Sequence, residues 1–246
     1  MTTLAFLLTD RLDAELTAPR LLAQLTADWG PEVAGFEADP EAEPGGPLAL
    51  TRGDQVIVLM GIDAPTGDDL ADLAAGSRLW PRDVPVPDHH AHVIVTVLTH
   101  RDDEPTHLEA QADMVLLSRV LASAIAVSDV QAVYLGAAHH IVLPAAFRDL
   151  AVAILPDPLV HAWIAVNVGA DPNGRMTGFT RGLGALGAMD IEIPETPESA
   201  EDTYERLFDT ALYLMEQGPV IGDGDTLGAT EAAEVVARHA LEAGGR

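Results

Sequence analysis

Residues 103–127 form the segment that most limits how this chain can fold. Asp103, Glu104 and Pro105 have the composition of a helix start, because carboxylates favour the positive end of the helix dipole and proline suits the first turn. Apolar residues then fall on every side of the expected helix, at Leu108, Val115, Leu116, Leu117, Val120, Leu121, Ala124 and Ile125. A helix that is apolar all round has to be buried. We therefore expect a central helix with other elements packed around it.

Short apolar runs of strand length lie on both sides of this helix. We expect strands, some of them paired as hairpins, at residues 4–8, 48–50 with 56–60, 91–99, 133–135 with 141–143, and 163–168. We expect the other helices at about 19–29, 68–75, 144–153 and 198–217. Because hairpins interrupt any regular alternation of strand and helix, the pattern predicts the α+β class. Its mixed, largely antiparallel sheet or sheets should pack against helices, in one domain or in two α+β lobes.

A proline-rich segment divides the chain in the sequence. Pro81, Pro85 and Pro87 cannot lie inside a helix or a central strand, since proline lacks the backbone N–H that both require. We predict a connector at 81–88, between an N-terminal α+β lobe at 1–80 and a C-terminal α+β lobe at 89–246. The two lobes can also pack as a single domain.

The net charge of the chain limits the classes of molecule that it can bind. Thirty-nine acidic residues against 13 basic ones give a net charge of −26, which creates a strong negative field around the protein. Nucleic acid is excluded as a partner, because phosphate contacts require a basic face. The N-terminus lacks the early positive charge of a signal peptide, and no segment has the roughly 20 uncharged apolar residues that cross a bilayer. We expect a cytoplasmic protein without a membrane partner.

Two residue types are missing, and their absence removes whole classes of chemistry. Every basic residue is arginine, so a Schiff-base lysine and a P-loop lysine are excluded. Cysteine is absent too, which excludes thiolate nucleophiles, disulfides, cysteine-ligated zinc and iron–sulfur clusters. No serine lies in a G-x-S-x-G motif, and an aromatic content of 4% disfavours a large planar cofactor. We expect no cofactor other than the divalent metal considered next.

Histidines and aspartates in two places could hold a divalent metal. His90 and His92 would share one face of a strand, since side chains two apart point the same way. Asp223 and Asp225 place two carboxylates in a tight turn, where a hard cation could bind. Imidazole and carboxylate together suit zinc or a similar ion. The structural interpretations are favoured: hydrogen-bonded histidines at a strand entrance, and a hairpin in which Thr226 begins the return strand.

A glycine-rich segment at 182–187 spells G-x-G-x-x-G, the pattern that holds a dinucleotide pyrophosphate. That motif should follow a strand and open a helix, whereas residues 189–193 alternate like a strand, so we interpret it as a turn with a bulge. Arg175 and Arg181 flank the segment and could bind an anion, although we expect them to pair with Asp190 and Glu192. The candidate functional surface here comprises Arg175, Thr180, Arg181, Asp190, Glu192 and Thr226.

The order of glycines, carboxylates and threonine in 177–193 and 218–228 resembles the signature of a bacterial family, Domain of Unknown Function 4261. The resemblance extends to the Trp29-Gly30 pair, the His-containing segment 90–97 and the Glu109-Ala110 pair. The chain departs from the family pattern at 61–65. The resemblance implies no assigned activity, and no catalytic residue can be transferred from it.

Two hypotheses of different classes remain. The first is a non-enzymatic protein-binding module, regulatory or immunity-like, because a field of this strength speeds encounter with a basic protein partner and repels acidic ones. The alternative is a metal-dependent hydrolase, in which a metal held by His90, His92, Asp223 or Asp225 lowers the pKa of bound water. Both are compatible with a monomer or with a homodimer formed through a sheet edge.

Overall fold

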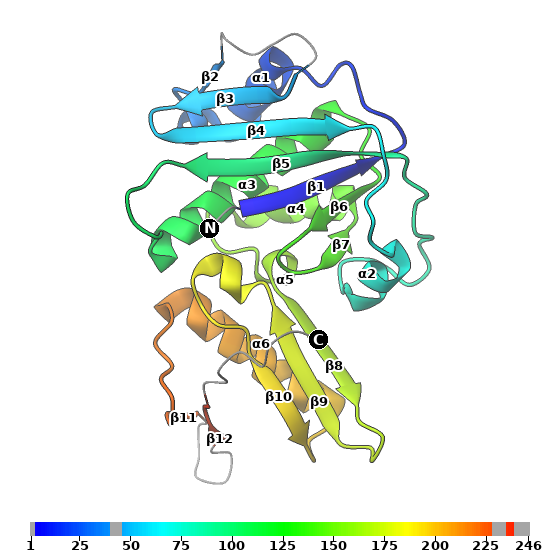
Figure 1. Ribbon diagram of the computed structural model, residues 1–246, viewed down its shortest axis with the longest axis vertical. Coiled ribbons are helices and arrows are strands. Elements are labelled where there is room, and N and C mark those ends of the chain that lie inside the picture. The colour runs from blue at the N-terminus through cyan, green and yellow to red at the C-terminus, as the bar shows by residue number, and fades with distance from the viewer. Residues whose placement is uncertain (1–2, 40–45, 228–234, 239–246) are drawn as a thin grey trace.

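The computed structural model describes residues 3–39, 46–227 and 235–238 (Figure 1). The larger sheet contains β1 (Thr3–Thr9), β2 (Glu37–Ala38), β3 (Leu48–Arg52), β4 (Gln55–Ile62), β5 (Ala91–Thr99), β6 (Ala132–Leu135) and β7 (His140–Val142). The smaller sheet contains β8 (Ala165–Ala170), β9 (Met176–Arg181) and β10 (Glu192–Thr196), and β11 (Thr226–Leu227) pairs with β12 (Val235–Val236). The helices are α1 (Ala18–Trp29), α2 (Leu70–Gly76), α3 (His107–Val127), α4 (Pro144–Ile154), α5 (Val160–Trp163) and α6 (Ala200–Gln217), with 3₁₀ turns η1 (Gly30–Val33) and η2 (Leu183–Leu186).

The prediction of an α+β fold with largely antiparallel sheets is confirmed. The larger sheet has the strand order β2-β3-β4-β5-β1-β6-β7 and the smaller one β10-β9-β8, and every strand pair in the described residues is antiparallel. Figure 1 shows the two sheets as an upper and a lower layer of the molecule, with α6 beside the smaller sheet. The hydrophobic core is continuous between the larger sheet and the part of the chain around the smaller sheet. Leu183, Leu186 and Ala211 belong to the same buried cluster as residues of β1, β3, β4 and β5.

The central helix predicted at 103–127 is present as α3. It packs against α1, α4 and β5, and residues on all its sides are buried. Its start is later than predicted, because Thr106 caps it: the Glu109 N–H donates to Thr106 Oγ1 at 3.4 Å, and Glu109 Oε2 accepts from the Thr106 N–H at 2.8 Å. By length and composition α3 could span a membrane, but 72% of its most apolar stretch is buried inside the protein.

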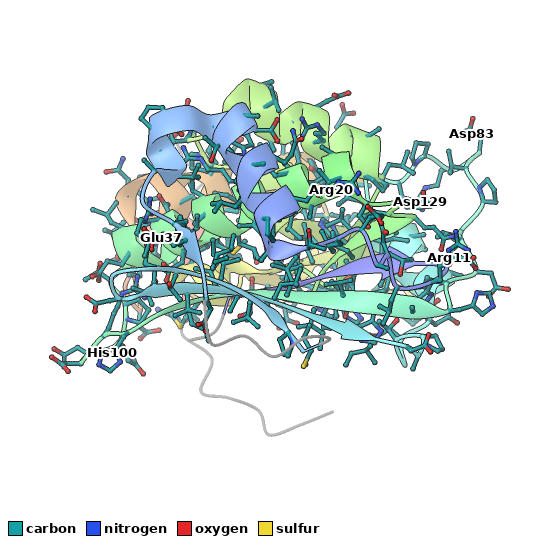
Figure 2. The ribbon with its side chains drawn as sticks, turned by 90° about the horizontal axis from the view of Figure 1, so that it is seen from above. Arg11, Arg20, Glu37, Asp83, His100 and Asp129 are labelled. Carbon is teal, nitrogen blue, oxygen red and sulfur yellow. The ribbon has the colours of Figure 1, made fainter. Side chains whose placement is uncertain are left out.

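Helices cover one face of the larger sheet fully and the other face only in part. Helices α1, α3 and α4 cover one face, as the view along the sheet in Figure 2 shows for α1 and α3. On the other face α2 and Trp80 pack over Leu8, Tyr134 and Ile141, so that only the β1-β6-β7 side is protected. The remainder of that face, over β3, β4 and β5, has no helix on it in the described residues.

Strands from before and after the proline-rich segment belong to the same larger sheet. β5 follows that segment in the sequence, yet it lies between β4 and β1, both of which precede it. Residues 81–88 therefore join two parts of one sheet, with Val84 and Val86 packed on its second core. The change from one sheet to the other comes at Ile164, between α5 and β8.

Candidate functional site

The glycine-rich segment forms a turn that Thr180 and Asp190 hold closed. The Thr180 hydroxyl donates to Asp190 Oδ1 at 3.0 Å and accepts from the Ile191 N–H at 2.8 Å. The same carboxylate accepts from the N–H groups of Gly182 at 3.4 Å and Leu183 at 3.1 Å. The turn contains η2 between β9 and β10, as the interpretation of a turn requires. Asp190 and Thr180 are thus occupied in shaping the backbone.

Replacing Asp190 with alanine should destabilise the protein by about 1–2 kcal/mol, because the buried N–H groups of Gly182 and Leu183 lose their acceptor. Asp190→Asn is the matched control, since the amide keeps one acceptor oxygen in place. Urea unfolding followed by circular dichroism measures both variants. Equal stability of the wild type and Asp190→Ala would contradict this role.

The predicted pairing of Arg175 and Arg181 with Asp190 and Glu192 is wrong. Asp190 is taken by the turn, and Arg175 lies 3.7 Å from Glu195 instead. The Arg181 guanidinium stacks over the Phe179 ring, 5.3 Å from its centroid. The prediction failed because backbone N–H groups compete for the carboxylate, and the sequence alone did not show how closely the turn would surround it.

The histidines of the metal hypothesis bind protein atoms. His90 Nδ1 lies 3.0 Å from Asp10 Oδ1 at the surface, and His92 Nδ1 lies 2.7 Å from the carbonyl oxygen of Ala64. Neighbouring His89 accepts from the Thr66 N–H through Nε2 at 2.8 Å, and burial, followed by the charge of His92, lowers its pKa. These are the contacts of hydrogen-bonded histidines at a strand entrance.

Asp223 and Asp225 lie in the turn before β11, away from the histidines at the start of β5. The Gly222 N–H donates to Asp225 Oδ2 at 2.6 Å, and Gly224 takes the positive φ of 89° that the turn needs. Thr226 begins β11, which pairs with β12 further along the chain, so it starts the first strand of the hairpin and not the return strand. Figure 1 shows this hairpin at the foot of the smaller sheet, far from the start of β5.

The structure therefore does not bring the four predicted metal ligands together. Within residues 3–39, 46–227 and 235–238, no group of three or more histidines and acids is placed to hold a metal ion. The histidines lie at the start of β5 and the aspartates in the turn before β11, a separation that the sequence spacing did not indicate.

Tyr134 and His139 form a polar cluster on the larger sheet that stabilises the fold. Tyr134 Oη lies 3.1 Å from His139 Nδ1, its ring stacks on Phe6 at 5.2 Å between centroids, and burial raises its pKa to about 12. A phenol with so high a pKa stays protonated at neutral pH and is a poor general base. The cluster fixes the β6–β7 hairpin, where His139 has a φ of 52°.

A groove of about 640 Å³ lies between the end of α2 and the smaller sheet with its helix α6. It is lined on one side by the end of α2 and the segment after it, on the other by the first turns of α6, and along its length by β8. Its lining residues are Ala75, Gly76, Arg78, Arg82, Val166, Asn167, Val168, Ala200, Glu201, Tyr204 and Glu205. Three consecutive residues of β8 line it, although alternate side chains of a strand point to opposite faces. The groove therefore follows the edge of the strand.

The backbone of β8 is available along this edge. The Thr180 N–H donates to the Ile191 oxygen at 2.8 Å, on the β10 side of β9. Since antiparallel pairs alternate between hydrogen-bonded and non-bonded, Val166, opposite Thr180, turns its N–H and C=O away from β9. The same applies to Val168, two residues on. Among the described residues β8 pairs only with β9, so these groups face the groove.

The walls of the groove carry opposite charges. Arg78 stacks on Tyr204, with its guanidinium carbon 3.3 Å from the ring centroid, and makes no ion pair with the described residues. Arg82 donates to the carbonyl oxygens of Ala74 at 3.2 Å and Ala75 at 3.0 Å, at the end of α2. Glu201 and Glu205 stand on the α6 wall. An occupant with both signs of charge would be matched here.

Sequence reasoning missed this groove. Its one signal was the scarcity of cations: Arg78 and Arg82 are two of 13 basic residues, and they flank Trp80-Pro81 in an acidic chain. The partner wall on α6 lies more than a hundred residues later, and only the fold places it opposite.

The comparison with protein families supports the resemblance seen in the sequence. Residues 179–242 match the family model described as Domain of unknown function (DUF4261). The match covers the glycine-rich turn, β10, α6 and the hairpin, and it includes the α6 wall of the groove. The chain matches no curated protein and no solved structure.

Proposed function

We propose that this chain is a cytoplasmic, non-enzymatic protein-binding module, regulatory or immunity-like, that holds an extended segment of a partner protein along β8. The observation that carries the proposal is the strand edge itself: Val166 and Val168 direct backbone N–H and C=O groups into a groove of about 640 Å³. An extended peptide adds to such an edge by main-chain hydrogen bonds, and pockets beside the edge select its side chains.

The charges of the chain support a partner with basic residues. The net charge of −26 attracts such a segment over distance, and Glu201 and Glu205 meet its cations at the groove. Arg78 and Arg82 on the opposite wall select an acidic side chain in the same segment. The alternative of a metal-dependent hydrolase has no comparable support, because its proposed ligands form no group of three or more among the described residues.

Val168→Pro tests this function. Proline removes the outward N–H, and it is tolerated on an edge strand whose N–H does not pair within the sheet. We expect peptides selected from a random display library on the wild-type protein to lose at least about tenfold in affinity for Val168→Pro, measured by fluorescence anisotropy. Peptides rich in arginine or lysine should bind more weakly as salt is raised.

Val168→Thr is the matched control, since it keeps both the N–H and the β-branched shape. It should bind the selected peptides as the wild type does, and both variants should keep the wild-type circular dichroism spectrum. Failure to enrich any peptide, or equal binding by folded Val168→Pro, would refute strand addition at this groove.

A further inference from the structure

The part of the larger sheet that no described helix covers is a mostly apolar surface, in which Thr51 and Thr96 are the polar residues. On this face the strand register aligns Val56 with Leu98 and Met60 with Ile94, and it places Leu4 beside Thr96 on the neighbouring strand. Leu4, Met60 and Leu98 are 37%, 38% and 42% exposed. Ala49, Val58 and Ile94 are half-buried between them. Figure 1 looks onto this face, and none of the labelled helices crosses in front of β3, β4 and β5.

The open sheet face, defined by Leu4, Ala49, Val56, Val58, Met60, Ile94 and Leu98, carries no charge. β1, β3, β4 and β5 contain one arginine and no acidic residue, although the chain has 39 acidic residues. That arginine, Arg52, stacks on Phe36 on the opposite, helix-covered face, 4.1 Å from the ring centroid. In Figure 2, labelled charged residues such as Arg20 and Asp83 lie toward the helix side or beyond the end of the sheet.

We propose that a second copy of this chain packs on the open sheet face, so that two sheets stack in a homodimer. A twofold axis brings the same surface from both copies together, and an uncharged apolar face is complementary to itself. A basic partner recognised by charge would not select a face that has no carboxylate. The proposal is independent of the groove at β8, because none of the residues that line the groove belongs to the open sheet face.

The size of the face fits a weak dimer of two copies. Four strands about 4.8 Å apart and about 20 Å long give roughly 400 Å² in projection. The accessible surface of this face is larger than its projected area, because side chains make the face uneven. A stable interface buries about 800 Å² on each partner, and weaker interfaces bury less. We therefore expect a dimer that forms at micromolar concentration. Sheets stacked in this way cross at about 30°.

Whether the dissociation constant of the dimer rises or falls with salt shows whether apolar or charged groups hold the two copies together. Each copy carries a net charge of −26, so two copies repel each other, and salt screens that repulsion without weakening apolar contact. Sedimentation equilibrium of the purified full chain should show a dimer whose dissociation constant falls between about 0.05 M and 0.5 M NaCl. A dimer held by charged groups would show the opposite dependence and would overturn the proposal.

Leu98→Glu places a charge at the most exposed position of the face and should raise the dissociation constant at least about tenfold. Leu108→Glu is the matched control, because Leu108 is 73% exposed on α3 and the substitution adds the same charge elsewhere. Met60→Glu gives a second test if Leu98→Glu does not fold. A monomer at all salt concentrations up to about 100 µM, or equal dimerisation of Leu98→Glu and Leu108→Glu, would overturn the proposal.

Discussion

Gly182→Ala is expected to lower the melting temperature by about 10 °C, corresponding to a loss of about 3 kcal/mol or more. Gly182 has a φ of 116°, a conformation that residues with a side chain rarely adopt. A Cβ atom at this position would lie 2.2 Å from the carbonyl oxygen of Trp163, where real contacts do not occur. The carbonyl belongs to buried backbone at the junction of the two sheets, so neither group can move cheaply. Thermal unfolding by circular dichroism measures the effect.

Gly184→Ala is the control within the same G-x-G-x-x-G motif. Its Cβ would meet no atom within 4 Å, and its φ is not positive, so alanine there should change stability by less than about 1 kcal/mol. If the two variants melt at the same temperature, the close approach of Gly182 to Trp163 is not a determinant of the fold. The comparison separates the structural reason for this glycine from the nucleotide-binding pattern that it resembles.

The second large effect is expected at Asp28, which joins the end of α1 to α3 and α4. Arg148 donates to both carboxylate oxygens at 2.9 and 3.0 Å, and Ser123 donates at 2.7 Å. The side chains of Asp28 and Arg148 are only 10% and 27% exposed. Asp28→Ala leaves the guanidinium largely buried without its partner, which should cost about 3 kcal/mol. Glu15→Ala is the control, since its exposed pair with Arg20 should contribute less than about 1 kcal/mol.

The same carboxylate should contribute to the pH dependence of stability. Burial alone would raise the pKa of Asp28, but hydrogen bonds from Arg148, Ser123 and Gln24 outweigh it, and the pKa is lowered. A lowered folded pKa means that the contribution is complete above the unfolded value of about 4 and is lost as pH falls through the folded pKa. The stability difference between the wild type and Asp28→Asn should therefore be constant near neutral pH and shrink below about pH 4. A difference that does not change down to acidic pH would contradict this assignment.

Most elements could be predicted because their apolar period was strong and their ends were marked. The strand at Thr3–Thr9, the helix at Ala18–Trp29 and the helix at Ala200–Gln217 have such patterns. Errors arose where local signals conflicted. Trp163 reads as part of a strand, yet it ends α5, and its indole N–H donates to Ser118 at 2.9 Å inside the core. Residues 189–193 read as a strand, but β10 spans Glu192–Thr196 and continues through Pro194, which an edge strand tolerates.

The candidate site was less predictable than the fold. Thr180 and Asp190, which the sequence places near each other, do share a hydrogen bond, because a turn of ten residues keeps them close. The walls of the groove come from 75–82, 166–168 and 200–205, and no periodicity or spacing connects such distant segments. The open sheet face was equally hidden, since its alternating residues are those of any strand with one buried side. What distinguishes it is that none of the described helices covers it.

The position of β1 in the larger sheet has a consequence for how this protein is made. Both neighbours of β1, the strands β5 and β6, are translated long after it, at residues 91–99 and 132–135. While the ribosome adds the intervening residues, the apolar segment at 3–9 has no partner with which to complete its hydrogen bonds. Sheets built from such distant pairings fold slowly and stay exposed to aggregation. The nascent chain should therefore depend on chaperones until β6 has emerged.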